Sequence, residues 1–237
     1  MTVLIGRLVA AAVMVLVLAT DVADAASRAV TFRSASGRMV SGFLTETDRG
    51  LAPAVVLVPM LGRPKDDWQP IADRLAAAGV HSLAIDLPSA SLPADPQELQ
   101  GWHQDIRGAV AFLATLSEVR PGALGVAGAS LGANLAAVAA AAEPSVRSLA
   151  LISPSLDYRG VRIEGAMQQY GARQALLAAS VQDPYAARSV RELEKLGSGL
   201  RTVLWSSTPA HGTALLSRDP EIARTLIDWF QQTLGVE

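Results

Sequence analysis

A serine flanked by two glycines carries the clearest chemical signal in this chain. Ser130 stands in the run GASLG, residues 128–132, directly after the apolar residues 123–127. The G-x-S-x-G spacing is typical of a strand that turns sharply into a helix with a serine hydroxyl at the corner. Strand and helix come so close there that a side chain at either glycine would clash. The pattern predicts that Ser130 is a nucleophile.

A serine hydroxyl needs a base to take its proton, and the best candidate is His211. In the chain order that accompanies this motif, the base follows the serine, and His211 is the only histidine downstream of it. It comes shortly after the predicted strand 202–206, at the carboxyl edge of a parallel sheet, where catalytic groups collect. His81 begins a predicted strand and so lies at the opposite edge, and His103 lies within a predicted helix. We expect neither of them to act as the base.

The carboxylate that would orient the imidazole is predicted to be Asp183. It follows the predicted strand 175–179, and Pro184 keeps Asp183 itself out of helical conformation while allowing a helix to start after it. Two alternatives remain open. Asp183 could simply cap that helix, or Asp157, which follows the predicted strand 148–153, could supply the acid.

Two backbone N–H groups are expected to form an oxyanion hole. One belongs to Leu131, directly after the nucleophile at the start of a helix. The other is expected from the loop 59–62 after the predicted strand 54–58, with Leu61 as the first choice and Met60 as the second.

Alternating strands and helices are predicted to position these residues. Residues 29–32 and 39–44 flank a tight turn and predict an antiparallel hairpin. Continuous aliphatic runs then indicate a parallel sheet covered on both faces. The further predicted strands are 54–58, 81–85, 123–127, 148–153, 175–179 and 202–206, and the predicted helices are 68–78, 97–116, 131–142, 186–196 and 221–234.

Residues 154–173 interrupt this alternation. They are longer than a plain crossover and mixed in polarity, so we interpret them as a short cap insertion with a brief helix at 163–169. An ordinary crossover helix with irregular ends is the alternative. With the cap in place, the substrate pocket would be lined by Leu61, Met60, Tyr158, Met167 and Tyr170.

The first 25 residues have the layout of a signal peptide. Arg7 precedes an apolar stretch from 8 to 19, and Ala23-Asp24-Ala25 supplies small residues for a peptidase. An apolar core of about a dozen residues is short of the ~20 that span a bilayer. We expect cleavage after Ala25, export to the periplasm or medium, and no stable membrane span afterwards; an uncleaved anchor is the alternative.

The composition and net charge limit which classes of partner and cofactor are expected. The chain has 237 residues, half of them hydrophobic, no cysteine and a net charge of −2. The length suits one domain, residues 26–237. The charge offers no basic field for nucleic acid. There is neither thiolate nor a His-x-x-x-His pair, so no metal and no cofactor are expected.

The order of these motifs resembles the α/β-hydrolase superfamily, in particular compact serine esterases and dienelactone-hydrolase-like members. The resemblance runs from about Ala29 to the last helix and implies an eight-stranded, mostly parallel sheet carrying a Ser130, Asp183, His211 triad. Many members have His-Gly at the start of the oxyanion loop, where this chain has Pro59-Met60. Met60 would fill space that glycine leaves open. A serine nucleophile argues against typical dienelactone hydrolases and against dehalogenase chemistry.

The expected activity is hydrolysis of a small or medium carboxylic ester through an acyl-enzyme. Peptide or amide hydrolysis by the same groups is an alternative, and so is a non-catalytic binding protein that retains the fold. The expected partner is a small-molecule ester, and the oligomeric state stays open.

Overall fold

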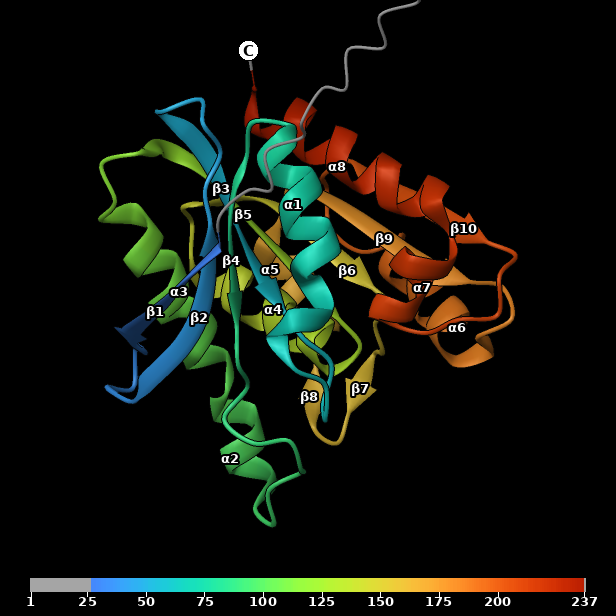
Figure 1. Ribbon diagram of the computed structural model, residues 1–237. Helices are drawn as coiled ribbons and strands as arrows, with labels where there is room; N and C mark the ends of the chain where they lie inside the picture. The colour runs from blue at the N-terminus through green and yellow to red at the C-terminus, as the bar shows by residue number, and fades with distance from the viewer. Residues whose placement is uncertain (1–26, 237) are drawn as a thin grey trace, which may run out of the picture.

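A single eight-stranded sheet organises the molecule (Figure 1). The computed structural model describes residues 27–236, so the predicted signal segment 1–25 lies outside the described residues. The strands follow the spatial order β1-β2-β4-β3-β5-β6-β9-β10, with antiparallel pairing only at β1-β2 and β2-β4. This confirms the predicted fold class. Their bounds are β1 Ser27–Arg33, β2 Met39–Thr45, β3 Ala52–Val58, β4 His81–Ile85, β5 Val119–Ala129, β6 Val146–Ile152, β9 Gln174–Ser180 and β10 Arg201–Ser206.

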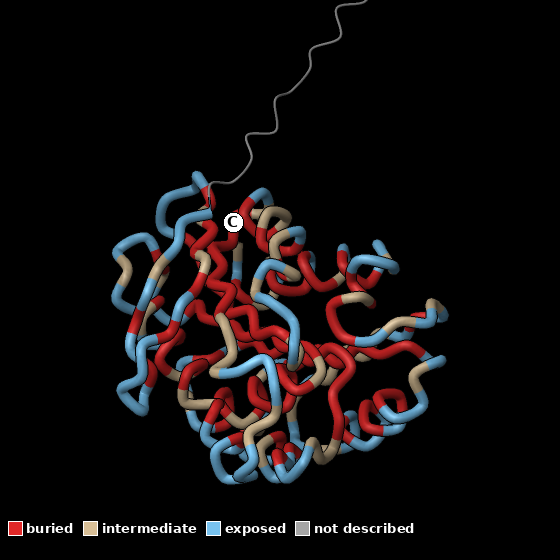
Figure 2. Tube along the Cα trace, turned by 60° about the horizontal axis from the view of Figure 1, so that its bottom comes forward, coloured by how far each residue is buried: buried red, intermediate tan, exposed pale blue. Residues whose placement is uncertain are grey.

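Helices cover both faces of the sheet. Alternate residues of the central strands point to opposite faces and enter two separate apolar clusters. One cluster joins Val56 and Val126 to α3 His103–Ala114, α4 Leu131–Ala142 and α6 Pro184–Leu193. The other joins Leu57 and Ala127 to α1 Gln69–Ala77 and α8 Pro220–Leu234. Figure 2 shows the buried chain running through the centre of the molecule.

The predicted long helix 97–116 is two helices. α2 Pro96–Gly101 begins at Asp95, whose side chain accepts from Gln97 N, and α3 begins after Trp102. The Trp102 ring is buried in the core, and the backbone N–H of Trp102 donates to Leu99 O, three residues back, so the chain changes direction there. The need to bury this indole explains the break. The short helices η1 Lys65–Trp68 and α7 Thr213–Arg218 complete the fold.

The segment after β6 forms a small hairpin and a short helix. β7 Asp157–Tyr158 pairs with β8 Val161–Arg162, and α5 Glu164–Tyr170 follows, within one residue of the predicted helix. Buried Asn134 of α4 holds the base of the hairpin, because its amide donates to Ser155 O at 2.9 Å and to Val161 O at 2.8 Å. The hairpin projects beyond the carboxyl edge of the sheet, on the same side as α2 (Figure 1).

Candidate active site

Ser130 stands on a strained turn between β5 and α4. Its φ is 53°, a left-handed value that is uncommon for a residue with a side chain. A Cβ on Gly128 would lie 2.2 Å from Gly132 O, and one on Gly132 would lie 2.4 Å from Pro59 O. Hydrogen is therefore the only substituent that fits at either flanking position, which is the steric reason anticipated for the two glycines.

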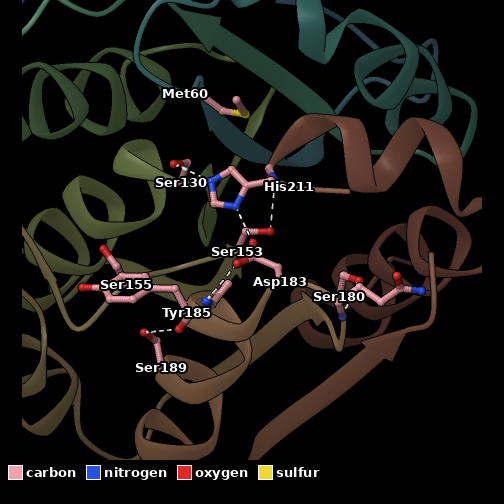
Figure 3. Close-up of polar contacts among 12 residues, drawn as sticks. Met60, Ser130, Ser153, Ser155, Ser180, Asp183, Tyr185, Ser189 and His211 are labelled. Carbon is pink, nitrogen blue, oxygen red and sulfur yellow. Dashed lines mark hydrogen bonds and ion pairs between the residues drawn. The ribbon is translucent and has the colours of Figure 1, made fainter. Parts of the chain in front are cut away.

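His211 lies directly against the serine. It sits in the loop between β10 and α7, and its Nε2 is 2.8 Å from Ser130 Oγ (Figure 3). The imidazole side chain is 46% exposed, so the pair opens to solvent. A neutral ring that donates from Nδ1 leaves Nε2 free to accept the serine proton. The geometry suits a base poised over a nucleophile.

Asp183 uses its two carboxylate oxygens for different tasks. Oδ2 lies 2.5 Å from His211 Nδ1, and Oδ1 accepts from Ala186 N at 3.2 Å as the cap of α6. One side chain thus caps α6 and also contacts the imidazole, so the capping alternative does not exclude an orienting role. The capping bond fixes the orientation of the carboxylate, and with it the position of the oxygen that contacts the imidazole.

Asp157 is committed elsewhere. It accepts from Gly160 N at 2.6 Å and from Arg162 Nε at 2.9 Å, and the hydrogen bond from Arg162 holds the pKa of Asp157 below its ordinary value. His81, at the opposite edge, is buried, with Nδ1 accepting from Thr47 N and Nε2 near two carbonyl oxygens. The structure brings neither residue to Ser130.

The two expected oxyanion donors come from neighbouring segments. Leu131 is the first residue of α4, so its N–H has no acceptor within the helix. The close packing of Gly132 on Pro59 brings the loop after β3, which carries Leu61, against this helix start. Both segments thus meet at the start of α4, next to Ser130.

Met60 fills the space beside the histidine loop, as expected from its size. Its Sδ lies 3.4 Å from Thr213 N and 3.7 Å from Thr213 Oγ1. A Cβ on Gly212 would fall 2.0 Å from this sulfur. The thioether therefore packs against the chain immediately after His211 (Figure 3).

Two predicted pocket residues are wrong. Met167 and Tyr170 of α5 are buried in the core, and the Tyr170 hydroxyl donates to Gln174 O, where β9 begins. That is the amino edge of the sheet, a strand length away from Asp183. α5 runs back along α4, so its apolar side chains are used in packing. Tyr158, in the projecting hairpin, is half-buried.

Sequence reasoning overlooked Tyr185 and Ser153. Tyr185 comes two residues after Asp183 in the sequence. It is 60% exposed, yet its hydroxyl donates to Asp157 O at 3.1 Å. An aromatic residue two positions after the acid was the available signal. Ser153 is buried and accepts from Gly212 N at 2.9 Å. Nothing in the sequence distinguishes it from an ordinary serine at a strand end.

Within residues 27–236, no group of three metal-binding side chains gathers in one place. No helix in that range is long and apolar enough to cross a bilayer.

Comparison with known proteins places this geometry in a family. Residues 55–235 match the model of the alpha/beta hydrolase family. No curated protein sequence matches the chain.

Solved structures share the whole fold at low sequence identity. A dienelactone hydrolase from Anabaena variabilis is 19% identical, covering 89% of this chain and 99% of its own, with a TM-score of 0.71. The esterase domain of a Rhodothermus marinus protein is 16% identical, covering 89% and 100%, with a TM-score of 0.72. An esterase from Pyrococcus furiosus is 14% identical, covering 89% and 94%, with a TM-score of 0.70. With the family match spanning most of its length, this chain belongs to the alpha/beta hydrolase family.

Proposed function

We propose that this protein hydrolyses carboxylic esters of small or medium size, with Ser130 as nucleophile, His211 as base and Asp183 as the acid that orients it. The observation that carries the proposal is the continuous contact from Ser130 Oγ to His211 Nε2, at 2.8 Å, and from His211 Nδ1 to Asp183 Oδ2, at 2.5 Å. The solved esterases of the same fold are consistent with this activity.

The reaction follows from these contacts. Ser130 Oγ attacks the ester carbonyl carbon while His211 Nε2 takes the hydroxyl proton, and Asp183 stabilises the resulting imidazolium. The carbonyl oxygen becomes an oxyanion, which the N–H groups of Leu131 and Leu61 are proposed to bind. The C–O bond to the alcohol then breaks, and His211 returns the proton to the departing oxygen. A water molecule activated by His211 hydrolyses the acyl-enzyme and restores Ser130.

The surroundings of the serine favour a short substrate. The hairpin that projects beyond the sheet edge is short, since β7 and β8 pair over only two residues each. His211 remains open to solvent, and Tyr185 offers an exposed ring held in place at its hydroxyl. We propose Tyr185 and Tyr158 as the apolar walls for the acyl or alcohol group, with Met60 limiting the space beside His211.

Labelling with a fluorophosphonate probe tests the proposal. Wild type should be labelled at Ser130, and Ser130→Ala should lose the label while melting at the same temperature as wild type. A folded wild type that stays unlabelled would contradict the proposal and favour the non-catalytic binding protein. Esters of graded acyl length then define the substrate, and matched anilides distinguish esterase from amidase activity. Faster cleavage of anilides would favour the amide alternative.

We further propose export of the mature chain, on the grounds of the residue pattern in 1–25. N-terminal sequencing of protein recovered from the periplasm or medium should begin at Ala26. A chain retained in the membrane fraction with Met1 intact would overturn this.

A further inference from the structure

Ser153 repeats, one strand away, the unusual backbone of the nucleophile. Of the described residues with side chains, only Ser130, Ser153 and Arg159 have positive φ, and Ser153 has 51°. It follows β6 directly, as Ser130 follows β5, and these strands are neighbours in the sheet. A non-glycine residue in this region costs free energy and persists only where surrounding contacts hold it.

The backbone of Ser153 connects the strands that carry the nucleophile and the acid. Ser130 N donates to Ile152 O at 2.9 Å, immediately before Ser153, and Ser153 N donates to Ala178 O at 2.7 Å. Ala178 lies in β9, which ends at Ser180, three residues before Asp183. These two bonds fix the ends of β5, β6 and β9 relative to one another.

The side chain of Ser153 reaches the third member of the site. Its Oγ accepts from Gly212 N at 2.9 Å, directly after His211, and the residue is only 1% exposed (Figure 3). The left-handed turn is what sends the chain away from β6 at the angle that places this hydroxyl under the histidine loop. On the other side of the loop, the next backbone amide, Thr213 N, meets the thioether of Met60, a weak acceptor, and the Thr213 hydroxyl donates to Asp67 Oδ2 at 3.3 Å.

We propose that Ser153 is a positioning residue, whose hydroxyl holds the Gly212 amide and so aims the His211 ring at Ser130 and Asp183. The proposal rests on the function proposed above for that triad. The role of Ser153 differs from those of the triad, because Ser153 touches none of the reacting atoms. The strain at its backbone is retained because the hydroxyl at that angle fixes the base. A misplacement of about 1 Å at such a base costs as much as a hundredfold in rate.

Two substitutions separate the hydroxyl from the strain. Ser153→Ala removes Oγ and keeps the strained Cβ, whereas Ser153→Gly removes both. If the hydroxyl positions His211, both variants should lower kcat and the fluorophosphonate labelling rate by about tenfold to a hundredfold. KM should stay within about twofold, because the substrate contacts are unchanged. Thermal melting should rank the glycine variant above the alanine variant, because glycine adopts φ of 51° without strain.

Ser34→Ala is the matched control. Ser34 is also buried and its Oγ accepts from a backbone amide, that of Arg38 at 3.0 Å, but it lies in the β1-β2 turn. This variant should leave kcat and labelling unchanged. Full activity in either Ser153 variant would overturn the proposal, because the base would then be held in place without the hydroxyl.

NMR tests the positioning role of Ser153 without measuring catalytic activity. The proton on His211 Nδ1, shared with Asp183, should give a far-downfield NMR signal in wild type, and the Gly212 amide should exchange slowly. Both Ser153 variants should shift or broaden that signal and accelerate exchange at Gly212, and Ser34→Ala should do neither. An unchanged signal in Ser153→Ala would overturn the proposal. If wild type is not labelled at all, the proposed esterase function fails, and these signals still test Ser153.

Discussion

At the amino edge of the sheet, where β6, β9 and β10 begin, charged side chains bind the backbone together. Arg173 donates to Glu143 O at 2.8 Å, to Val146 O at 2.9 Å and to Tyr170 O at 3.0 Å, and its guanidinium stacks over the Tyr170 ring. Burial raises the pKa of Tyr170, whose hydroxyl is bonded to Gln174 O. The Arg173 bonds thus join the end of α5 to the start of β6 and to the chain that leads into it.

At the carboxyl edge, where β5, β6 and β9 end, polar groups are strained or exposed instead. Ser130 and Ser153 have left-handed backbone, and the His211 ring is 46% exposed. Strained backbone of this kind lowers stability locally and is most often found at functional sites. The comparison indicates that substitutions at the two edges should affect different measurements: activity at the carboxyl edge and stability at the amino edge.

The largest expected effect is the loss of activity in Ser130→Ala and His211→Ala. Each should lower kcat for an ester by about 10⁴-fold or more, because a nucleophile and its base, the roles proposed for these residues, act as one unit. The free energy of unfolding, measured in urea, should stay close to that of wild type in both variants. A variant that keeps more than a tenth of the activity would place the chemistry elsewhere.

Asp183→Asn should come next, with a fall in kcat of about 10³-fold to 10⁴-fold, because an amide cannot stabilise the imidazolium. Asparagine caps a helix as well as aspartate, so the stability of α6 should be kept. The paired control is Asp157→Asn, which should retain wild-type kcat. The opposite outcome, with Asp157→Asn inactive and Asp183→Asn mild, would reassign the acid.

At the amino edge, Arg173→Ala should lower stability by about 2 kcal/mol, because hydrogen bonds from a charged donor to three carbonyls are lost. Urea unfolding measures this, and kcat at 25 °C should stay unchanged. Arg191→Ala is the comparison, since that guanidinium only stacks over the Trp205 ring at 5.1 Å. If both variants lost the same free energy of unfolding, the hydrogen bonds of Arg173 would add no more stability than the stacking of Arg191.

The smallest expected effect is a pH-dependent one in the hairpin. Because Arg162 lowers the pKa of Asp157, the carboxylate adds stability above its ordinary pKa of 3.8, and this contribution is lost as the pH falls through the lowered folded value. Asp157→Asn should therefore be slightly less stable than wild type at pH 6 and equal to it at pH 2. Melting curves at both values would show this. Salt should reduce the gap at pH 6, since the pair is exposed.

The residues of the candidate triad could be predicted because each follows a strand end, and strand ends are visible as aliphatic runs that stop. Helix α4, Leu131–Ala142, was predicted to the residue for a similar reason: alanine and leucine favour helix throughout. The direction of side chains on α5 could not be predicted, because packing against α4 decides it, and Met167 and Tyr170 were misplaced accordingly.

Two further features depend on the assembled core. The break at Trp102 arises because burying its indole overrides helix continuity, although the local sequence favours one helix. The positive φ of Ser153 has no sequence signal at all, because serine rarely adopts it and only contacts from β9 and from the histidine loop make it stable.

The contact between Met60 and Gly212 limits how this site can be redesigned or diversified. Replacing Met60 with glycine removes the sulfur contact to Thr213 N and also opens volume. A side chain at 212 would have to displace the thioether and would also need a backbone of φ 59°. The two positions are therefore size-complementary, and we expect a broader specificity to evolve only through paired changes that rebuild the support of the histidine.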